Sequence, residues 1–135
     1  FATPVVERVY RRTPDGFMLT MDDDGGSMSS HFVFSALGLY PACMGDPYYV
    51  IGSPLFGEVT LRLGDKTFVI RAKGAGLANP YIQSAKLNGE PFNKTWIDYK
   101  TLCGGGVLEF EMGPVPNFEW ASGPEAAPPS LSHKN

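Results

Sequence analysis

The hydrophobic pattern of the chain changes at Pro41 from a helical repeat to a strict alternation. Beyond Pro41, short alternating segments are separated by turn residues, and two of these turns, Gly64-Asp65 and Asn88-Gly89, are typical of two-residue hairpins. Several short strands joined by tight turns predict an antiparallel sheet or sandwich. The segments that we expect to be strands are residues 48–51, 58–63, 66–72, 81–87 and 107–112.

The residues before Pro41 predict helices. Thr3-Pro4 resembles an N-cap followed by proline at the first helical position, which indicates a short amphipathic helix to about Arg12. A second helix is expected over residues 28–37, closed by Gly38. Apolar residues lie on most sides of this second helix, so we expect it to be buried on more than one face. A chain of 135 residues has too few partners for such a helix, which indicates that some of its neighbours are missing.

These patterns predict an α+β chain in three parts. Residues 1–42 form the helical part, residues 43–120 form the antiparallel β unit, and residues 121–135 form a tail. The tail is rich in Ala, Ser, Gly and Pro, so we expect it to bury nothing and to be disordered. Gly104-Gly105-Gly106 is expected to be a flexible hairpin tip. Cys43 and Cys103 permit one disulfide but do not require it.

Charge and composition exclude two classes of partner. The formal net charge is -3 and the chain has no cluster of Lys and Arg, so it lacks the basic surface that nucleic-acid binding needs. No apolar run approaches the roughly 20 residues of a membrane-spanning helix. The chain begins with Phe1 rather than Met, which favours a processed product or a piece of a longer polypeptide.

The most conspicuous polar motif is a run of three aspartates, Asp22, Asp23 and Asp24, followed by Gly25 and Gly26. Like charges repel, so a fold that concentrates them gives up stability unless it needs them. The glycines permit a tight turn, and the start of the following helix would offset negative charge. Such a cluster suits a metal ion, a general base or a polyhydroxyl ligand, although from composition alone an acidic solvated loop is the more ordinary interpretation.

Other polar and aromatic residues suggest little chemistry. His31 lies in the apolar second helix, where a packed, hydrogen-bonded histidine is a simpler interpretation than a catalytic base. Trp96 and Trp120 could stack on a sugar, but packing in the core or at an interface is the ordinary role of tryptophan. The serines lack a nucleophile elbow, and the cysteines lack the spacing of metal ligands.

Residues 22–41 resemble the signature of family 92 glycoside hydrolases, which are calcium-dependent, exo-acting α-mannosidases. The stretch reads Asp-Asp-Asp-Gly-Gly-Ser-Met-Ser-Ser-His-Phe-Val-Phe-Ser-Ala-Leu-Gly-Leu-Tyr-Pro. The similarity continues through residues 49–56, 81–89 and 110–114, so it covers nearly the whole chain with several blocks in the right order. Family members are much longer and pair an N-terminal β-sandwich with an (α/α)6 barrel. The resemblance implies that this chain is their C-terminal segment, with the terminal helices of the barrel followed by the β unit.

The resemblance also implies a mechanism, inverting glycoside hydrolysis, in which one carboxylic acid protonates the leaving oxygen and a carboxylate activates water. Asp24 matches the family's general base, and Asp22 matches a neighbour that would hold the water or tune its partner. Calcium in the family contacts mannose hydroxyls, but the resemblance does not place its ligands, or any substrate-binding residue, on this chain.

The chain departs from the family at three positions near the motif. Met21 replaces a Gly, Ser30 an Ala and His31 a Trp, which puts substrate contacts near the helix in doubt. The family's general acid is a glutamate far upstream that has no match here, so we expect the chain to need the rest of the enzyme, the β-sandwich and remaining barrel, and to be inactive alone. A non-catalytic binding or structural module derived from such an enzyme is the alternative. The resemblance further implies a mannose-containing glycan as substrate and a location outside the cytoplasm.

Overall fold

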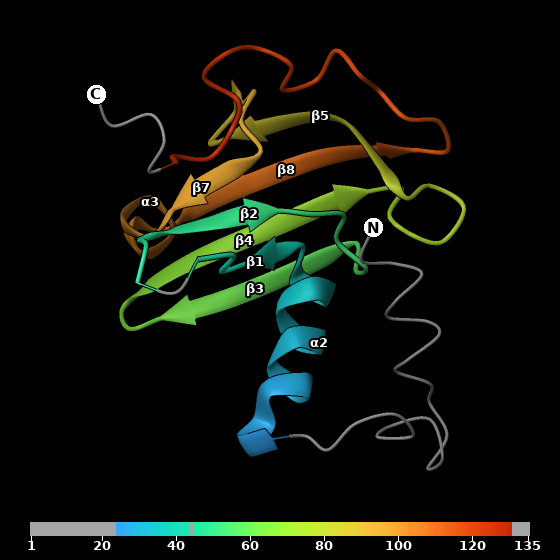
Figure 1. Cartoon of the computed structure of the whole chain (residues 1–135). Helices are drawn as coiled ribbons and strands as arrows, with labels where there is room; N and C mark the ends of the chain where they lie inside the picture. The colour runs from blue at the N-terminus through green and yellow to red at the C-terminus, as the bar shows by residue number, and fades with distance from the viewer. Residues whose placement is uncertain (1–23, 44, 131–135) are drawn as a thin grey trace.

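Two β-sheets form the framework of the computed structural model, which describes residues 24–43 and 45–130 (Figure 1). A short 3-10 turn, η1 (Asp24–Gly26), and the helix α2 (Ser27–Leu37) lead into them. The smaller sheet has the order β1 (Leu39–Tyr40), β2 (Tyr48–Ile51) and β7 (Trp96–Asp98). The larger sheet has the order β3 (Glu58–Leu63), β4 (Lys66–Lys73), β8 (Gly106–Gly113), β5 (Tyr81–Leu87) and β6 (Glu90–Pro91). A second helix, α3 (Tyr99–Gly104), joins β7 to β8.

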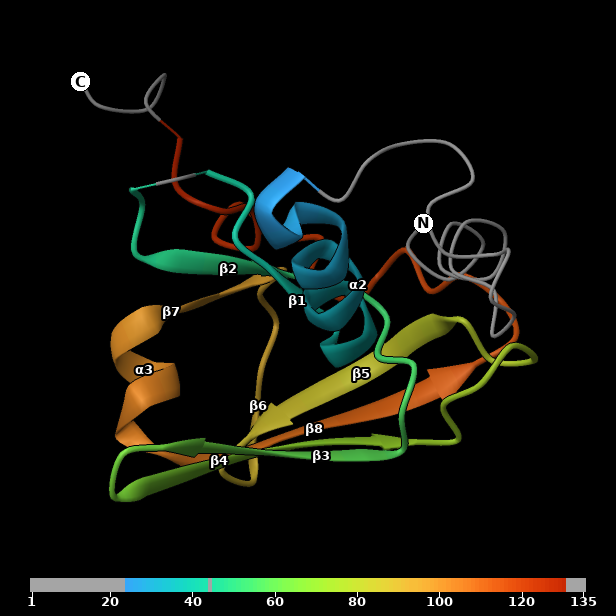
Figure 2. The ribbon, with the colours of Figure 1, turned by 90° about the horizontal axis from the view of Figure 1, so that it is seen from below.

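The core lies between the larger sheet and a layer made of the smaller sheet and α3 (Figure 2). Alternate residues of β4 and β8 face inward, and Phe68, Ile70 and Leu108 are almost completely buried there. Ile97 of β7 and Leu102 of α3 close the core from the other side. The strand alternation read from the sequence therefore marks the inward face correctly, because each strand of this sheet is buried on one side.

Charged side chains pair on the outer face of the larger sheet. Arg71 of β4 binds Glu58 of β3 at 2.9 Å and lies 4.0 Å from Glu109 of β8. Lys73 and Glu111 form a second cross-strand pair at 3.4 Å. These pairs are exposed, so each contributes little to stability, but they make this face suited to water.

Both predicted hairpins are confirmed. Gly64 and Asp65 connect β3 to β4, with Leu63 opposite Lys66. Asn88 and Gly89 connect β5 to β6, and their φ angles of 52° and 87° are the left-handed values that this hairpin turn requires.

The prediction of an antiparallel unit is wrong for one pair of strands, because β4 and β8 run parallel, from Phe68 opposite Gly106 to Lys73 opposite Glu111. An alternating strand has the same pattern in either pairing, so the sequence did not distinguish them. The larger sheet is therefore mixed.

The prediction of a flexible tip at residues 104–106 is also wrong. Gly104 ends α3, Gly105 follows it as the C-cap, and Gly106 begins β8. Gly106 lies against the side chain of Asn88, whose Oδ1 accepts a hydrogen bond from the Val107 backbone at 2.8 Å. The glycines permit this close approach rather than providing flexibility.

The helix predicted over residues 28–37 is confirmed as α2, and Gly38 closes it with φ of 78°. Figure 1 shows α2 extending away from the sheets from its contact with β1. Met28, Ser35 and Ala36 are buried, whereas Val33 is 52% exposed, so the described residues cover α2 only in part. The helix predicted near residues 4–12 lies outside the described residues, and the (α/α)6 barrel stays a prediction.

The described part of the predicted tail, residues 121–130, returns to the small sheet. Ala126 is buried, and its carbonyl accepts hydrogen bonds from the Thr95 backbone at 2.9 Å and from the Thr95 hydroxyl at 2.8 Å. The prediction that the tail buries nothing is therefore wrong at Ala126, because this turn completes the hydrogen bonding of the segment that enters β7. Among the described residues, no helix is both long enough and apolar enough to span a membrane.

Candidate functional site

Asp24 lies on an exposed turn at the free end of α2. Three consecutive residues, Asp24, Gly25 and Gly26, have positive φ angles of 25°, 70° and 91°. Aspartate tolerates this region better than most side chains, and the two glycines adopt it without cost. The turn thus places a carboxylate immediately before the helix, as the sequence predicted. Asp22 and Asp23 lie outside the described residues, so their placement beside Asp24 stays a prediction.

The N-terminus of α2 is the positive end of the helix that follows Asp24. Gly26 is the N-cap, and as a glycine it has no side chain to bond to the first turn. The positive end of the helix dipole favours negative charge next to the turn. The arrangement can support an anionic or polyhydroxyl ligand beside the turn.

The residues described here do not form a cage for calcium. Nowhere in residues 24–43 and 45–130 do three or more His, Cys, Asp or Glu side chains come together as metal ligands. Calcium usually takes six to eight oxygen ligands, so Asp24 could contribute at most a small share of such a site. The described residues therefore do not fit the metal by themselves.

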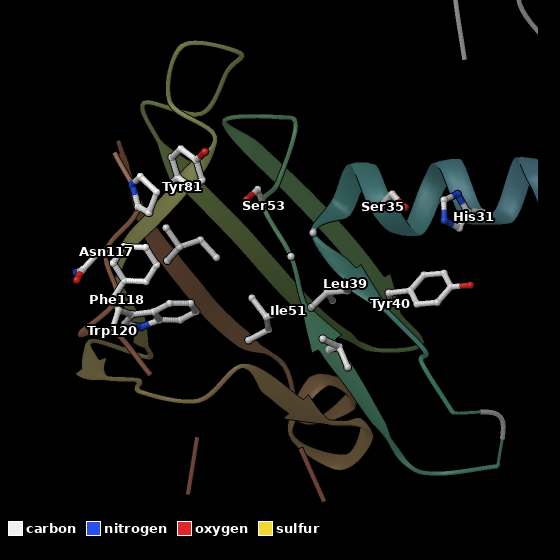
Figure 3. A pocket seen from close by; sticks show the side chains of 15 residues that line it. His31, Ser35, Leu39, Tyr40, Ile51, Ser53, Tyr81, Asn117, Phe118 and Trp120 are labelled. Carbon is white, nitrogen blue, oxygen red and sulfur yellow. The ribbon is translucent and has the colours of Figure 1, made fainter. Parts of the chain in front are cut away.

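A cavity of about 730 Å³ lies beside α2, along the stretch from His31 to Gly38 (Figure 3). Figure 3 shows Ser35, His31 and Tyr40 on one side of this cavity and Tyr81, Phe118 and Trp120 on the other. We call it the aromatic groove. It is bounded by the residues His31, Ser35, Gly38, Leu39, Tyr40, Val50, Ile51, Gly52, Ser53, Tyr81, Ile82, Pro116, Asn117, Phe118 and Trp120.

His31 is half-buried in the wall of the aromatic groove. Its ring packs edge-on against Tyr40, with 5.4 Å between the ring centroids. This contact agrees with the interpretation of His31 as a packing residue, although the histidine borders a cavity rather than a closed interior.

The two tryptophans pack against the protein. Trp120 contacts the core, and its indole Nε1 donates to the Phe92 carbonyl at 3.1 Å. Trp96 packs edge-on against Tyr48, and the Lys94 ammonium lies 4.8 Å from its ring centroid. The indole N–H of Trp96 is buried without a hydrogen-bond partner among the described residues. Packing is thus the role of both rings in this structure, as the sequence favoured.

Both cysteines are free thiols. A hydrogen bond with Asp46 and the charge of that carboxylate raise the pKa of the exposed Cys43 thiol. A raised pKa keeps the thiol protonated at neutral pH, which disfavours a role for Cys43 as a nucleophile.

Sequence reasoning found the acidic turn but missed two features. These are the aromatic groove and Asp98, the residue that caps the N-terminus of α3. The groove joins α2 and β1 to residues 116–120, which are distant in the sequence, so no local pattern predicts it. Asp98 had a local signal, since an aspartate three residues before Thr101 is typical of an N-cap.

Comparison with known proteins identifies the family to which the chain is similar. The sequence model of the glycosyl hydrolase family 92 catalytic domain matches residues 2–114. An uncharacterized secreted glycosidase from Arthroderma benhamiae is 35% identical over 114 residues, which are 82% of this chain and 14% of that protein.

Solved structures of the same family have the same fold. A GH92 inverting mannosidase from Bacteroides thetaiotaomicron superposes with a TM-score of 0.89 at 39% identity, over 97% of this chain and 18% of that one. A GH92 alpha-mannosidase from the same organism superposes with a TM-score of 0.90 at 32% identity, over 96% of this chain and 17% of that one. The chain thus spans less than a fifth of the proteins that it matches.

Proposed function

The chain belongs to glycoside hydrolase family 92, and on this premise we propose that it is the C-terminal segment of an α-mannosidase that hydrolyses terminal α-mannosyl linkages of glycans. The match to the family's catalytic domain over residues 2–114 and the likeness to two mannosidases support this proposal. Because the chain spans less than a fifth of those mannosidases, the rest of the active site would come from other polypeptide.

Asp24 is our candidate for the general base. One observation supports this assignment: an exposed carboxylate on a left-handed turn, directly before the N-terminus of α2. In an inverting hydrolysis, Asp24 would take a proton from water while the water oxygen bonds to C1 of the mannose. The bond from C1 to the leaving oxygen breaks in the same step, and an acid about 6.5–9.5 Å away protonates that oxygen.

Two further parts of the site would lie outside the described residues. We propose that Asp22 orients the attacking water or tunes its partner, as its match to the family motif implies. We also propose that the general acid belongs to polypeptide outside this chain. Alone, the chain would then hold half of a catalytic pair and would release no mannose.

Calcium dependence is part of the same proposal, with most of the ligands coming from outside the described residues, which hold no group of three or more ligating side chains. Treating the complete enzyme with a chelator should abolish mannose release, and added calcium should restore it. Full activity in the chelator, after bound calcium has been shown by metal analysis to be gone, would contradict this part of the proposal.

We also propose that the enzyme acts outside the cytoplasm, because the fungal relative is named a secreted glycosidase. Detection of the native enzyme in the culture medium or the periplasm would support that location, and its confinement to the cytoplasm would contradict it.

Product stereochemistry tests the proposed mechanism directly. The complete polypeptide that contains this chain would be incubated with an α-mannoside, and the anomeric protons of the released sugar would be followed by NMR. We expect β-mannose to appear first and α-mannose only after mutarotation. An initial α-anomer would contradict inversion, and no mannose release at all would favour the binding-module alternative.

A further inference from the structure

The aromatic groove has the composition of a protein interface. Tyr40 and Tyr81 stand at its rim, and Phe118 is 85% exposed. An exposed phenylalanine is costly in water, and rings gathered around a concave surface are typical of the anchoring region of an interface. Figure 3 shows Phe118 and Tyr81 on the wall opposite α2, so a partner that enters the groove would contact both walls.

Several polar side chains of the groove already bond to the chain itself. The Ser53 hydroxyl donates to the Pro80 carbonyl. The Asn117 amide donates to the Gln83 carbonyl at 2.8 Å, and the Trp120 indole donates to the Phe92 carbonyl. These bonds occupy the indole N–H of Trp120 and one donor each of Ser53 and Asn117, so fewer donors remain for the hydroxyls of a sugar. Apolar atoms form the larger part of the surface of the groove and favour apolar side chains of a polypeptide.

The opposite face of the molecule has the reverse character. Arg71 pairs there with Glu58, and Lys73 pairs with Glu111, on the outer side of the larger sheet. These charged pairs suit that face to solvent. The two faces together orient the molecule, with a charged side toward water and an aromatic groove toward a partner.

The lengths of the relatives identify the partner. This fold occurs in chains of which it makes up only 16–18%, and it superposes on three of them over 92–97% of its own length. We propose that the aromatic groove is the docking surface for apolar side chains from the remaining part of the family 92 enzyme. Phe118 would be the central anchor of this interface. The inference rests on the proposed function in treating the chain as a segment of that longer enzyme.

Hydroxyl-radical footprinting of the complete, unmutated polypeptide tests the inference, with oxidation at each aromatic residue measured by peptide mass spectrometry. Phe56 is the matched control, because it is 48% exposed and lies outside the groove. Since interface cores pack as densely as protein interiors, we expect Phe118 to react about tenfold more slowly than in the denatured polypeptide. Oxidation of Phe118 as fast as that of Phe56 would overturn the proposal.

Two other occupants would also overturn it. If protection of Phe118 disappears when the protein is diluted to a monomer, the groove binds a second copy instead. If protection appears only when α-mannobiose is added, the groove is a sugar site.

A pair of variants gives an independent measurement. Phe118→Asp should lower the melting temperature of the complete polypeptide, whereas Leu77→Asp, at an exposed apolar residue outside the groove, should leave it unchanged. Equal effects of the two variants would contradict docking at Phe118. The footprint does not depend on catalysis, so Asp24→Asn should lower the rate of mannose release about 10²–10⁴-fold and leave Phe118 protected. Loss of the interface and loss of the proposed reaction are thus distinguishable.

Discussion

At the scale of single residues, Gly38 determines how α2 meets the sheets. Its φ angle of 78° is left-handed, and a Cβ at this position would lie 2.7 Å from Pro54 Cγ and 2.9 Å from the Pro54 backbone nitrogen. Both the backbone angle and the space therefore require glycine. Asp24 precedes the N-terminus of the same helix, so the angle that Gly38 sets between α2 and the sheets also determines the position of the Asp24 carboxylate.

Replacing Gly38 should therefore cost more than replacing a glycine in the acidic turn. Gly38→Ala combines a strained backbone with a contact against proline backbone, and we expect a loss of about 3 kcal/mol of stability. Gly25→Ala, where a Cβ would meet nothing within 4 Å, should cost about 1 kcal/mol from the φ angle of 70° alone. Thermal unfolding of the complete polypeptide would measure both, and equal losses would contradict the steric part of this account.

At the scale of helices and strands, most of the fold follows from local patterns. Each half-buried strand alternates visibly, and Asn88-Gly89 predicts its hairpin because both residues must adopt left-handed angles. The parallel pairing of β4 with β8 was not predictable, since it depends on the path of the chain through β7 and α3. The six-residue helix α3 was missed because it is too short to show a helical period.

The N-cap of α3 provides a pH-dependent prediction. Asp98 accepts hydrogen bonds from the Thr101 backbone at 2.7 Å and from the Thr101 hydroxyl at 2.6 Å. Burial is the largest single influence and opposes ionisation, but hydrogen bonds from Thr101, and from the backbone of Asp98 and Lys100, together outweigh it and lower the pKa of the Asp98 carboxyl. The stabilisation is therefore complete above the unfolded pKa of about 3.9 and is lost as the pH falls through the folded pKa.

We expect Asp98→Ala to lower stability by about 1 kcal/mol at neutral pH, the usual cost of losing an N-cap. The difference from the wild type should shrink below about pH 4, where the wild-type carboxyl takes up its proton. Asp98→Asn is the matched control, because an amide can cap the helix but does not titrate. Denaturant unfolding at pH 7 and pH 3 would measure the three proteins, and a constant difference for Asp98→Ala would contradict the role of the ionised carboxyl.

At the scale of the whole molecule, Asp24 precedes the N-terminus of α2, and the aromatic groove lies along the helix from His31 to Gly38. Asp24 was predictable from the sequence because a turn and a helix start are local features. The aromatic groove was not, because it forms only when residues 116–120 fold back beside α2 and β1. The general acid that we propose lies outside this chain, so no pattern in this sequence could predict it.

The central claim is that Asp24 is the base of an α-mannosidase, and the most direct test is the kcat of the complete polypeptide carrying Asp24→Asn. General-base catalysis is worth about 10²–10⁴-fold, so we predict a loss of that size. Asp65→Asn, which changes an equally exposed aspartate at the β3–β4 hairpin, should retain full activity. Added azide, which attacks without a base, should partly restore turnover by Asp24→Asn and yield β-mannosyl azide. Unchanged kcat in Asp24→Asn, or an equal loss in both variants, would contradict the account.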